Sequence, residues 1–142
     1  MTRIISLFLL SLVVLSSCDK NNPNNAEPTI KELITSGVWL IDHVDIDGVD
    51  YTSSFEGMTL KVGEGYYEST NGNYPWLDTD TWDFIDDTYR LVIRGDGIEV
   101  QVINISAKNL TLGLIWNDPV YTIGGRESSV LGEHVFLFKK SN

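Results

Sequence analysis

Residues 81–105 read TWDFIDDTYRLVIRGDGIEVQVINI, three short runs of β-branched and aromatic residues separated by residues that favour turns. Side chains of these kinds pack well on a pleated sheet, and Gly95-Asp96-Gly97 is typical of a tight turn. We therefore expect strands at 81–86, 89–94 and 98–105. Strands joined so closely are antiparallel, because a parallel pair needs a long crossover connection.

The alternation of side chains in the last two runs indicates which face is buried. In the first of them Tyr89, Leu91 and Ile93 share a face, opposite Arg90 and Arg94. In the second, polar Glu99 and Gln101 alternate with the apolar residues Ile98, Val100 and Val102. We expect the apolar sets to face the interior, together with Trp82 and Phe84 from the preceding strand.

The same pattern extends outward along the chain. Turn signals such as Asp47-Gly48 and Asn71-Gly72-Asn73 separate further apolar runs. We expect additional strands at 38–46, 57–62, 65–70, 109–116 and 133–140, which makes eight. Eight short antiparallel strands can close into an up-and-down barrel, which removes exposed edges. The sequence thus predicts an all-β barrel, with a two-sheet β-sandwich as the alternative.

The N-terminus carries an export signal. Arg3 precedes an apolar run over residues 4–14, which is too short to span a bilayer. The sequence Leu15-Ser16-Ser17-Cys18 that follows resembles the lipobox of bacterial lipoproteins. The resemblance implies that residues 1–17 are a signal peptide, removed after the Cys18 thiol has received diacylglycerol, and that two or three acyl chains anchor the protein to a membrane.

Composition limits the rest of the chain. Residues 18–28 are rich in Asn and Pro and predict a flexible tether, which leaves 29–142 as one domain. Cys18 is the only cysteine, so no intrachain disulfide is possible. The formal net charge is −10, and removing the signal takes away Arg3 but no acid. Nucleic acid is therefore not an expected partner.

The start of the domain carries a second resemblance. Ile30, Leu33 and Ile34 have helical spacing, and Gly37-Val38-Trp39 follows. A short helix running into Gly-x-Trp at the first strand resembles lipocalins, and with the eight strands and the ending Val135-Phe136-Leu137-Phe138-Lys139 the pattern resembles the lipocalin-like lipoproteins of Bacteroidetes. The resemblance implies that Trp39 closes one end of the barrel beneath the helix, against a basic residue such as Lys139 or Lys140.

Aromatic residues in the middle of the chain are the candidate ligand site. Tyr74 and Trp76 flank Pro75 in an expected loop, where they either plug a barrel end or form a contact surface. We expect a small apolar ligand at the open end, rimmed by 47–57, 71–80 and 117–132. The tentative ligand-binding residues are Tyr74, Trp76, Trp82, Phe84 and Tyr89.

Other candidate sites are weaker. The segment LDTDTWDFIDD at 77–87 is acidic but lacks the ligand spacing of a calcium loop, so we expect no metal and no cofactor. His43 and His134 fall on the first and last strands, which become neighbours if the barrel closes. No nucleophile motif accompanies them, so we do not expect an enzyme.

Two classes of function follow. The first is a cell-envelope binding module for a small apolar molecule, and the second is an interaction protein with a filled barrel whose loops contact a protein or glycan. We expect a lipid-anchored protein, with the outer membrane favoured. Asp19 directly after Cys18 leaves the inner membrane open, because an acidic residue there retains lipoproteins in some bacteria.

The lipobox generates a direct prediction. Cys18→Ser is expected to abolish lipidation, because a hydroxyl does not replace the thiol that accepts the diacylglyceryl group. Metabolic labelling with a fatty-acid probe measures this, with the wild-type chain as the positive control. Continued labelling of Cys18→Ser would contradict the lipoprotein prediction.

Overall fold

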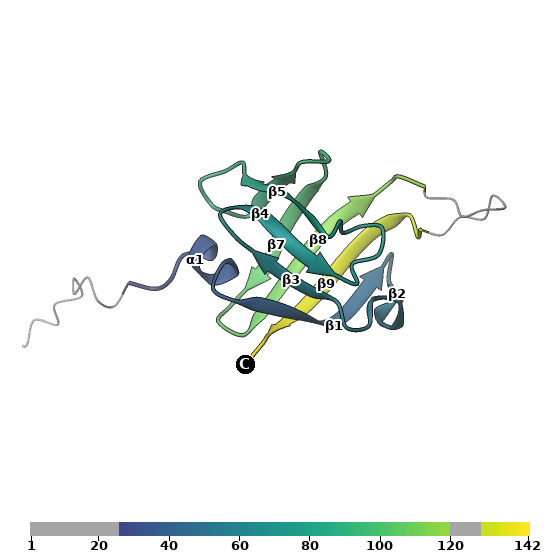
Figure 1. Ribbon diagram of the computed structural model, residues 1–142, viewed down its shortest axis with the longest axis horizontal. Helices are drawn as coiled ribbons and strands as arrows, with labels where there is room; N and C mark the ends of the chain where they lie inside the picture. Colours follow the sequence, from purple (N-terminus) through teal and green to yellow (C-terminus); the bar gives the residue numbers. More distant parts are fainter. Residues whose placement is uncertain (1–25, 120–128) are drawn as a thin grey trace, which may run out of the picture.

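The computed structural model describes residues 26–119 and 129–142, so the expected signal peptide, Cys18 and most of the tether lie outside the described residues. Within these ranges the chain forms nine strands, one short α-helix and one 3-10 turn (Figure 1). In chain order the elements are α1 (Ile30–Ile34), β1 (Val38–Ile46), β2 (Val49–Asp50), η2 (Thr52–Phe55), β3 (Thr59–Val62), β4 (Gly65–Thr70), β5 (Thr79–Phe84), β6 (Leu91–Arg94), β7 (Glu99–Ile105), β8 (Asn109–Trp116) and β9 (Gly132–Lys140).

The strands close into a barrel. From β3 to β9 each strand pairs antiparallel with the next, and β1 pairs with both β3 and β9. The closing β1–β9 ladder runs from Trp39 opposite Lys140 to Ile46 opposite His134. The extra strand β2 extends only the β1 hairpin. The expected eight-stranded up-and-down barrel preceded by a short helix is therefore confirmed, and the sandwich alternative is wrong because the sheet is continuous.

The inward face of β6 differs from the expectation. Val92 and Arg94 are buried, whereas Leu91 and Ile93 are only partly buried. Tyr89 has a positive φ of 57° and belongs to the turn before the strand. The prediction that Leu91 and Ile93 face the interior is wrong, and the reason is the register in which β6 pairs with β5. Arg94 pairs with buried Trp82, and directly opposite residues of antiparallel strands point to the same face. The inward assignment of Val100 and Val102 on β7 is confirmed.

Helix α1 covers one end of the barrel. Thr29 and Glu32 form a capping box that fixes its start. Its buried residue Ile34 accepts a hydrogen bond from Trp39 Nε1 at 2.8 Å, and Trp39 is 0% exposed. The expectation that Trp39 closes the barrel beneath the helix is thus confirmed.

Of the two C-terminal lysines that the family resemblance offered as the basic partner of Trp39, Lys140 lies directly opposite Trp39 in the closing ladder, and its Nζ donates to Ser36 Oγ at 2.7 Å. Lys139 Nζ forms an ion pair with Asp42 at 2.7 Å. Among the described residues, Arg94 is the cation that lies over aromatic rings, those of Tyr67 and Trp76.

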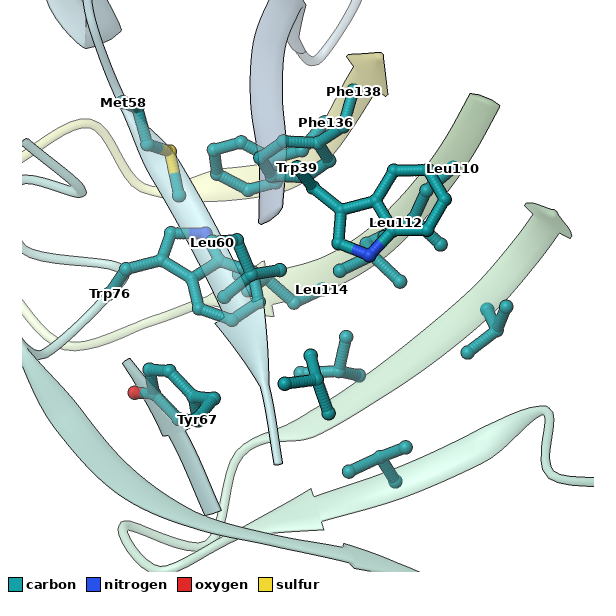
Figure 2. Close-up of a cluster of buried hydrophobic side chains, with 14 of the residues drawn as sticks. Trp39, Met58, Leu60, Tyr67, Trp76, Leu110, Leu112, Leu114, Phe136 and Phe138 are labelled. Atoms are coloured by element: carbon teal, nitrogen blue, oxygen red, sulfur yellow. The ribbon is translucent and has the colours of Figure 1, made fainter. Parts of the chain in front are cut away.

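The barrel interior is filled by large side chains contributed by strands on all sides (Figure 2). The largest of them, each almost completely buried, are Trp39, Tyr67, Trp76, Trp82, Phe136 and Phe138. A barrel of eight strands is just wide enough for its interior to be packed in this way. Any site for a ligand must therefore lie at an end of the barrel or on its outer wall.

Trp39 provides a test of this packing. Trp39→Ala is expected to lower the free energy of unfolding by about 3 to 5 kcal/mol, the usual range for emptying a buried aromatic site. Trp39→Phe is the control, since it keeps a ring but loses the hydrogen bond to Ile34, and its loss should be smaller. Urea unfolding measures both. A loss below about 1 kcal/mol for Trp39→Ala is typical of an exposed position and would contradict the closing role.

Candidate functional site at the barrel mouth

The end of the barrel opposite α1 is its mouth. The β1–β3 connection with β2 and η2, the loop between β4 and β5, and the start of β9 meet there (Figure 1). A pocket of about 360 Å³ opens between them. Its lining is mostly apolar or aromatic and contains no charged side chain among the described residues; it consists of Ile46, Tyr51, Ser54, Phe55, Asn73, Tyr74, Pro75, Ser129, Val130 and His134.

The pocket walls are held together by hydrogen bonds. Asn73 Nδ2 donates to the Ser54 carbonyl and so ties the β4–β5 loop to η2. Tyr51 N donates to the Val44 carbonyl at 2.9 Å, which fixes the start of η2 against β1. The pocket is therefore formed by parts of the chain whose positions are already set by the fold.

Trp76 plugs the barrel beneath the mouth. It belongs to the β4–β5 loop, yet it is only 1% exposed. Its ring meets Tyr67 edge-on at 5.4 Å and stacks on Trp82 at 6.4 Å. Gly72 makes the inward turn possible, because a Cβ at that position would overlap the Cβ of Trp76. The loop aromatics were expected either to plug a barrel end or to form a contact surface, and Trp76 is a plug.

Arg94 anchors the plug. Its guanidinium is 0% exposed and bonds to both carboxylate oxygens of Asp96 and to the Pro75 carbonyl. It also lies 5.1 Å from the centre of the Trp76 ring, a cation–π arrangement. A buried cation is tolerated only when its charge and donors are satisfied, and here they are. Arg94 is therefore a structural residue that fixes the loop carrying Trp76.

The acidic stretch 77–87 contributes to this support. Asp80 Oδ2 accepts from Asp96 N at 3.1 Å, so it positions the partner of Arg94. Asp86 caps the next turn, accepting from Thr88 Oγ1 at 2.7 Å and from Arg90 N at 3.1 Å. These hydrogen bonds lower the pKa of Asp86, the side-chain bond from Thr88 most of all. Across residues 26–119 and 129–142 there is no group of three or more His, Cys, Asp or Glu side chains placed to hold a metal ion.

His134 is the most deeply buried polar side chain among the described residues that line the pocket. It is 1% exposed and stacks on Phe136 with ring centres 5.8 Å apart. Its Nδ1 lies 3.0 Å from the Gly132 carbonyl oxygen. Burial lowers the pKa of His134, outweighing the opposite effects of that hydrogen bond and of Asp47. The imidazole in the pocket is therefore neutral at neutral pH.

The two histidines are not brought together. His134 lies opposite Ile46 in the closing ladder, whereas His43 lies opposite Leu137, further towards the helix end. His43 is partly exposed and its Nδ1 lies 3.0 Å from Thr52 Oγ1. The ladder thus makes their strands neighbours, as expected, but a joint histidine site does not form.

The five predicted ligand-binding residues divide between the two ends. Tyr74, 40% exposed, lines the mouth pocket, and Trp76 lies below it. A smaller cavity of about 260 Å³ near α1 is lined in part by the other three, Trp82, Phe84 and Tyr89. They therefore do not form one site with Tyr74.

Tyr51 and Phe55 lie within the predicted rim segment 47–57 but were not singled out by sequence reasoning, and His134 was considered only as one of a pair of histidines. The alternation of His134 with Phe136 and Phe138 along β9 was a usable signal, because all three are buried on the same face. Tyr51 and Phe55 lie in a connection that contains η2, and no strand periodicity marks them.

No helix in the described ranges is long and apolar enough to cross a membrane. A scan against models of known protein families gives no match, and a search of curated proteins gives none either.

The buried imidazole predicts a pH dependence of stability. In the unfolded chain His134 takes up a proton below about pH 6.5, whereas in the folded protein its pKa is lower. The unfolded state therefore binds more protons in that window, and the stability that His134 contributes is complete above about pH 6.5 and is lost as the pH falls through the folded-state pKa. Urea midpoints at pH 7.5 and 5.5 measure the loss, which His134→Phe should reduce. Equal losses in the two proteins would contradict the assignment.

Proposed function

We propose that this protein is a lipid-anchored binding module of the bacterial cell envelope, whose mouth pocket receives a small, largely apolar molecule. The observation that carries the proposal is a pocket of about 360 Å³ above a filled barrel. Pockets for small molecules usually occupy about 300 to 1,000 Å³ and combine an apolar lining with a few polar groups. The mouth pocket has this composition, with Tyr51, Phe55 and Tyr74 beside Ser54 and Asn73.

The anchor rests on the lipobox resemblance at Leu15-Ser16-Ser17-Cys18. The described chain enters the domain at α1, which lies at the closed end of the barrel. If the tether is attached at the closed end, the mouth at the opposite end faces away from the anchored terminus. We propose the outer membrane as the location, with the inner membrane as the alternative that Asp19 leaves open.

We propose that the mouth pocket binds its ligand and does not catalyse a reaction on it. The Nδ1 of His134 contacts a backbone carbonyl, where a hydrolytic triad would place a carboxylate. His134 therefore lacks the carboxylate partner that the histidine of such a triad has.

An interaction protein is the second candidate, and one observation favours it. The outer wall carries a groove of about 460 Å³ across β6, β7, β8 and β9, whose lining includes Gly113 and Ile115. Ile115 is 60% exposed, and Ile103, which lies beside Gly113, is 44% exposed. Exposed apolar groups gathered over a polar rim are typical of contact surfaces. A photo-reactive residue at position 115 that crosslinks a defined envelope partner would support this candidate.

The binding proposal is tested with an uncharged fluorescent probe. N-phenyl-1-naphthylamine is expected to bind the purified domain with a Kd below about 1 mM, which corresponds to more than about 4 kcal/mol of binding free energy. Tyr74→Ala should weaken binding several-fold, because Tyr74 lines the pocket. Ile115→Ala, on the outer wall, is the matched control and should bind as the wild type does. Absence of binding by the wild type would favour the interaction protein.

A further inference from the structure

The mouth pocket holds one polar side chain that is almost completely buried, and this side chain restricts what the pocket accepts. His134 reaches the pocket from β9 while the rest of its ring packs on Phe136. A ligand that covers a polar atom without bonding to it removes that atom from water and leaves it without a partner, which is costly. The hydrogen-bonding capacity that His134 still has is therefore the strongest chemical feature of the site.

The hydrogen bond of His134 decides which ring nitrogen is available. The partner of Nδ1 is the Gly132 carbonyl oxygen, which only accepts hydrogen bonds, so Nδ1 carries the proton. In a neutral imidazole the other nitrogen is then an acceptor. Within the described residues Nε2 has no hydrogen-bond partner, although it is not among the fully enclosed polar atoms. Because His134 lines the pocket and Nε2 is not fully enclosed, Nε2 is the acceptor that His134 can offer to a ligand there.

The other described walls of the pocket offer no counter-charge to a charged ligand. None of them carries an ionised side chain, so an entering carboxylate or ammonium would lose its hydration without gaining a counter-charge. A carboxylate would also meet the lone pair of Nε2 and the nearby negative charge of Asp47, which interacts with His134. The rings of Tyr51, Phe55 and Tyr74 offer flat apolar contact instead, which suits an aromatic group.

We propose that the mouth pocket selects a small uncharged aromatic molecule bearing a hydroxyl group, which donates a hydrogen bond to His134 Nε2. This inference rests on the proposed binding function and assigns its ligand class. The phenolic hydroxyl supplies the donor that Nε2 lacks, while the ring replaces water against the aromatic walls. An ether of the same size would fill the pocket equally well but leave Nε2 without a partner.

The test compares three probes of the same ring system: 2-naphthol, 2-methoxynaphthalene and 2-naphthoate. Calorimetry and competition against N-phenyl-1-naphthylamine measure their Kd values on the purified domain. We expect 2-naphthol to bind about tenfold more tightly than 2-methoxynaphthalene, a ratio that one neutral hydrogen bond can provide. The anionic 2-naphthoate should bind more weakly than either. Equal Kd values for naphthol and its ether would overturn the inference while leaving the binding function intact, and no binding of any probe would overturn both.

Two variants assign the selectivity to His134. His134→Phe keeps a ring on Phe136 but has no acceptor, so the ratio between naphthol and its ether should fall to near one while the ether binds as before. His134→Asn serves if the Phe variant does not fold, because its amide can still donate towards Gly132 but offers nothing at the position of Nε2. Ile115→Ala, on the outer wall, is the matched control and should keep the tenfold ratio. Retention of that ratio in a folded His134 variant would contradict the role of Nε2.

Discussion

The width of an eight-stranded barrel governs the rest of this structure. Its interior holds either side chains or one small ligand, and here it holds rings from Trp39, Trp76 and Trp82. Trp39 fills the end beneath α1, and Trp76 fills the end beneath the mouth. Because the inner space is occupied, the candidate site lies at the rim, where loops and strand ends form a pocket above the packed core.

Filling the barrel with these residues leaves polar atoms inside it. Within the described residues, Tyr67 Oη and the Nε1 atoms of Trp76 and Trp82 are buried without hydrogen-bond partners. Burial also raises the pKa of Tyr67 to about 12, which keeps its phenol neutral. Arg94 lies over two of these rings, and its cation–π contacts offset part of the cost of burying unpaired donors. The region below the mouth is therefore tightly packed, but some of its buried polar atoms lack hydrogen bonds.

The strands, the leading helix and the role of Trp39 could be predicted from the sequence, because alternation, turn residues and helical spacing are local signals. The inward direction of Arg94 could not, since it depends on pairing with Trp82 and on Asp96 and the Pro75 carbonyl as partners. Trp76 was recognised as unusual, but only the approach to Gly72 determines that it enters the barrel. The rim segments 47–57, 71–80 and 117–132 could be predicted from the expected topology, and described residues of all three line the mouth pocket. Which side chains meet there could not, because contacts between such distant segments leave no periodic trace in a sequence.

The candidate site is coupled to the closure of the barrel through one short set of hydrogen bonds. Asp47 N donates to the Glu133 carbonyl at 3.0 Å, and Asp47 Oδ1 accepts from Glu133 N at 3.0 Å, so the end of β1 holds the start of β9. Gly132 is required there, because its φ is 127° and a Cβ would overlap the Asp47 carboxylate. The Gly132 carbonyl in turn fixes the ring of His134. The contacts that close the barrel therefore also orient the His134 ring in its mouth.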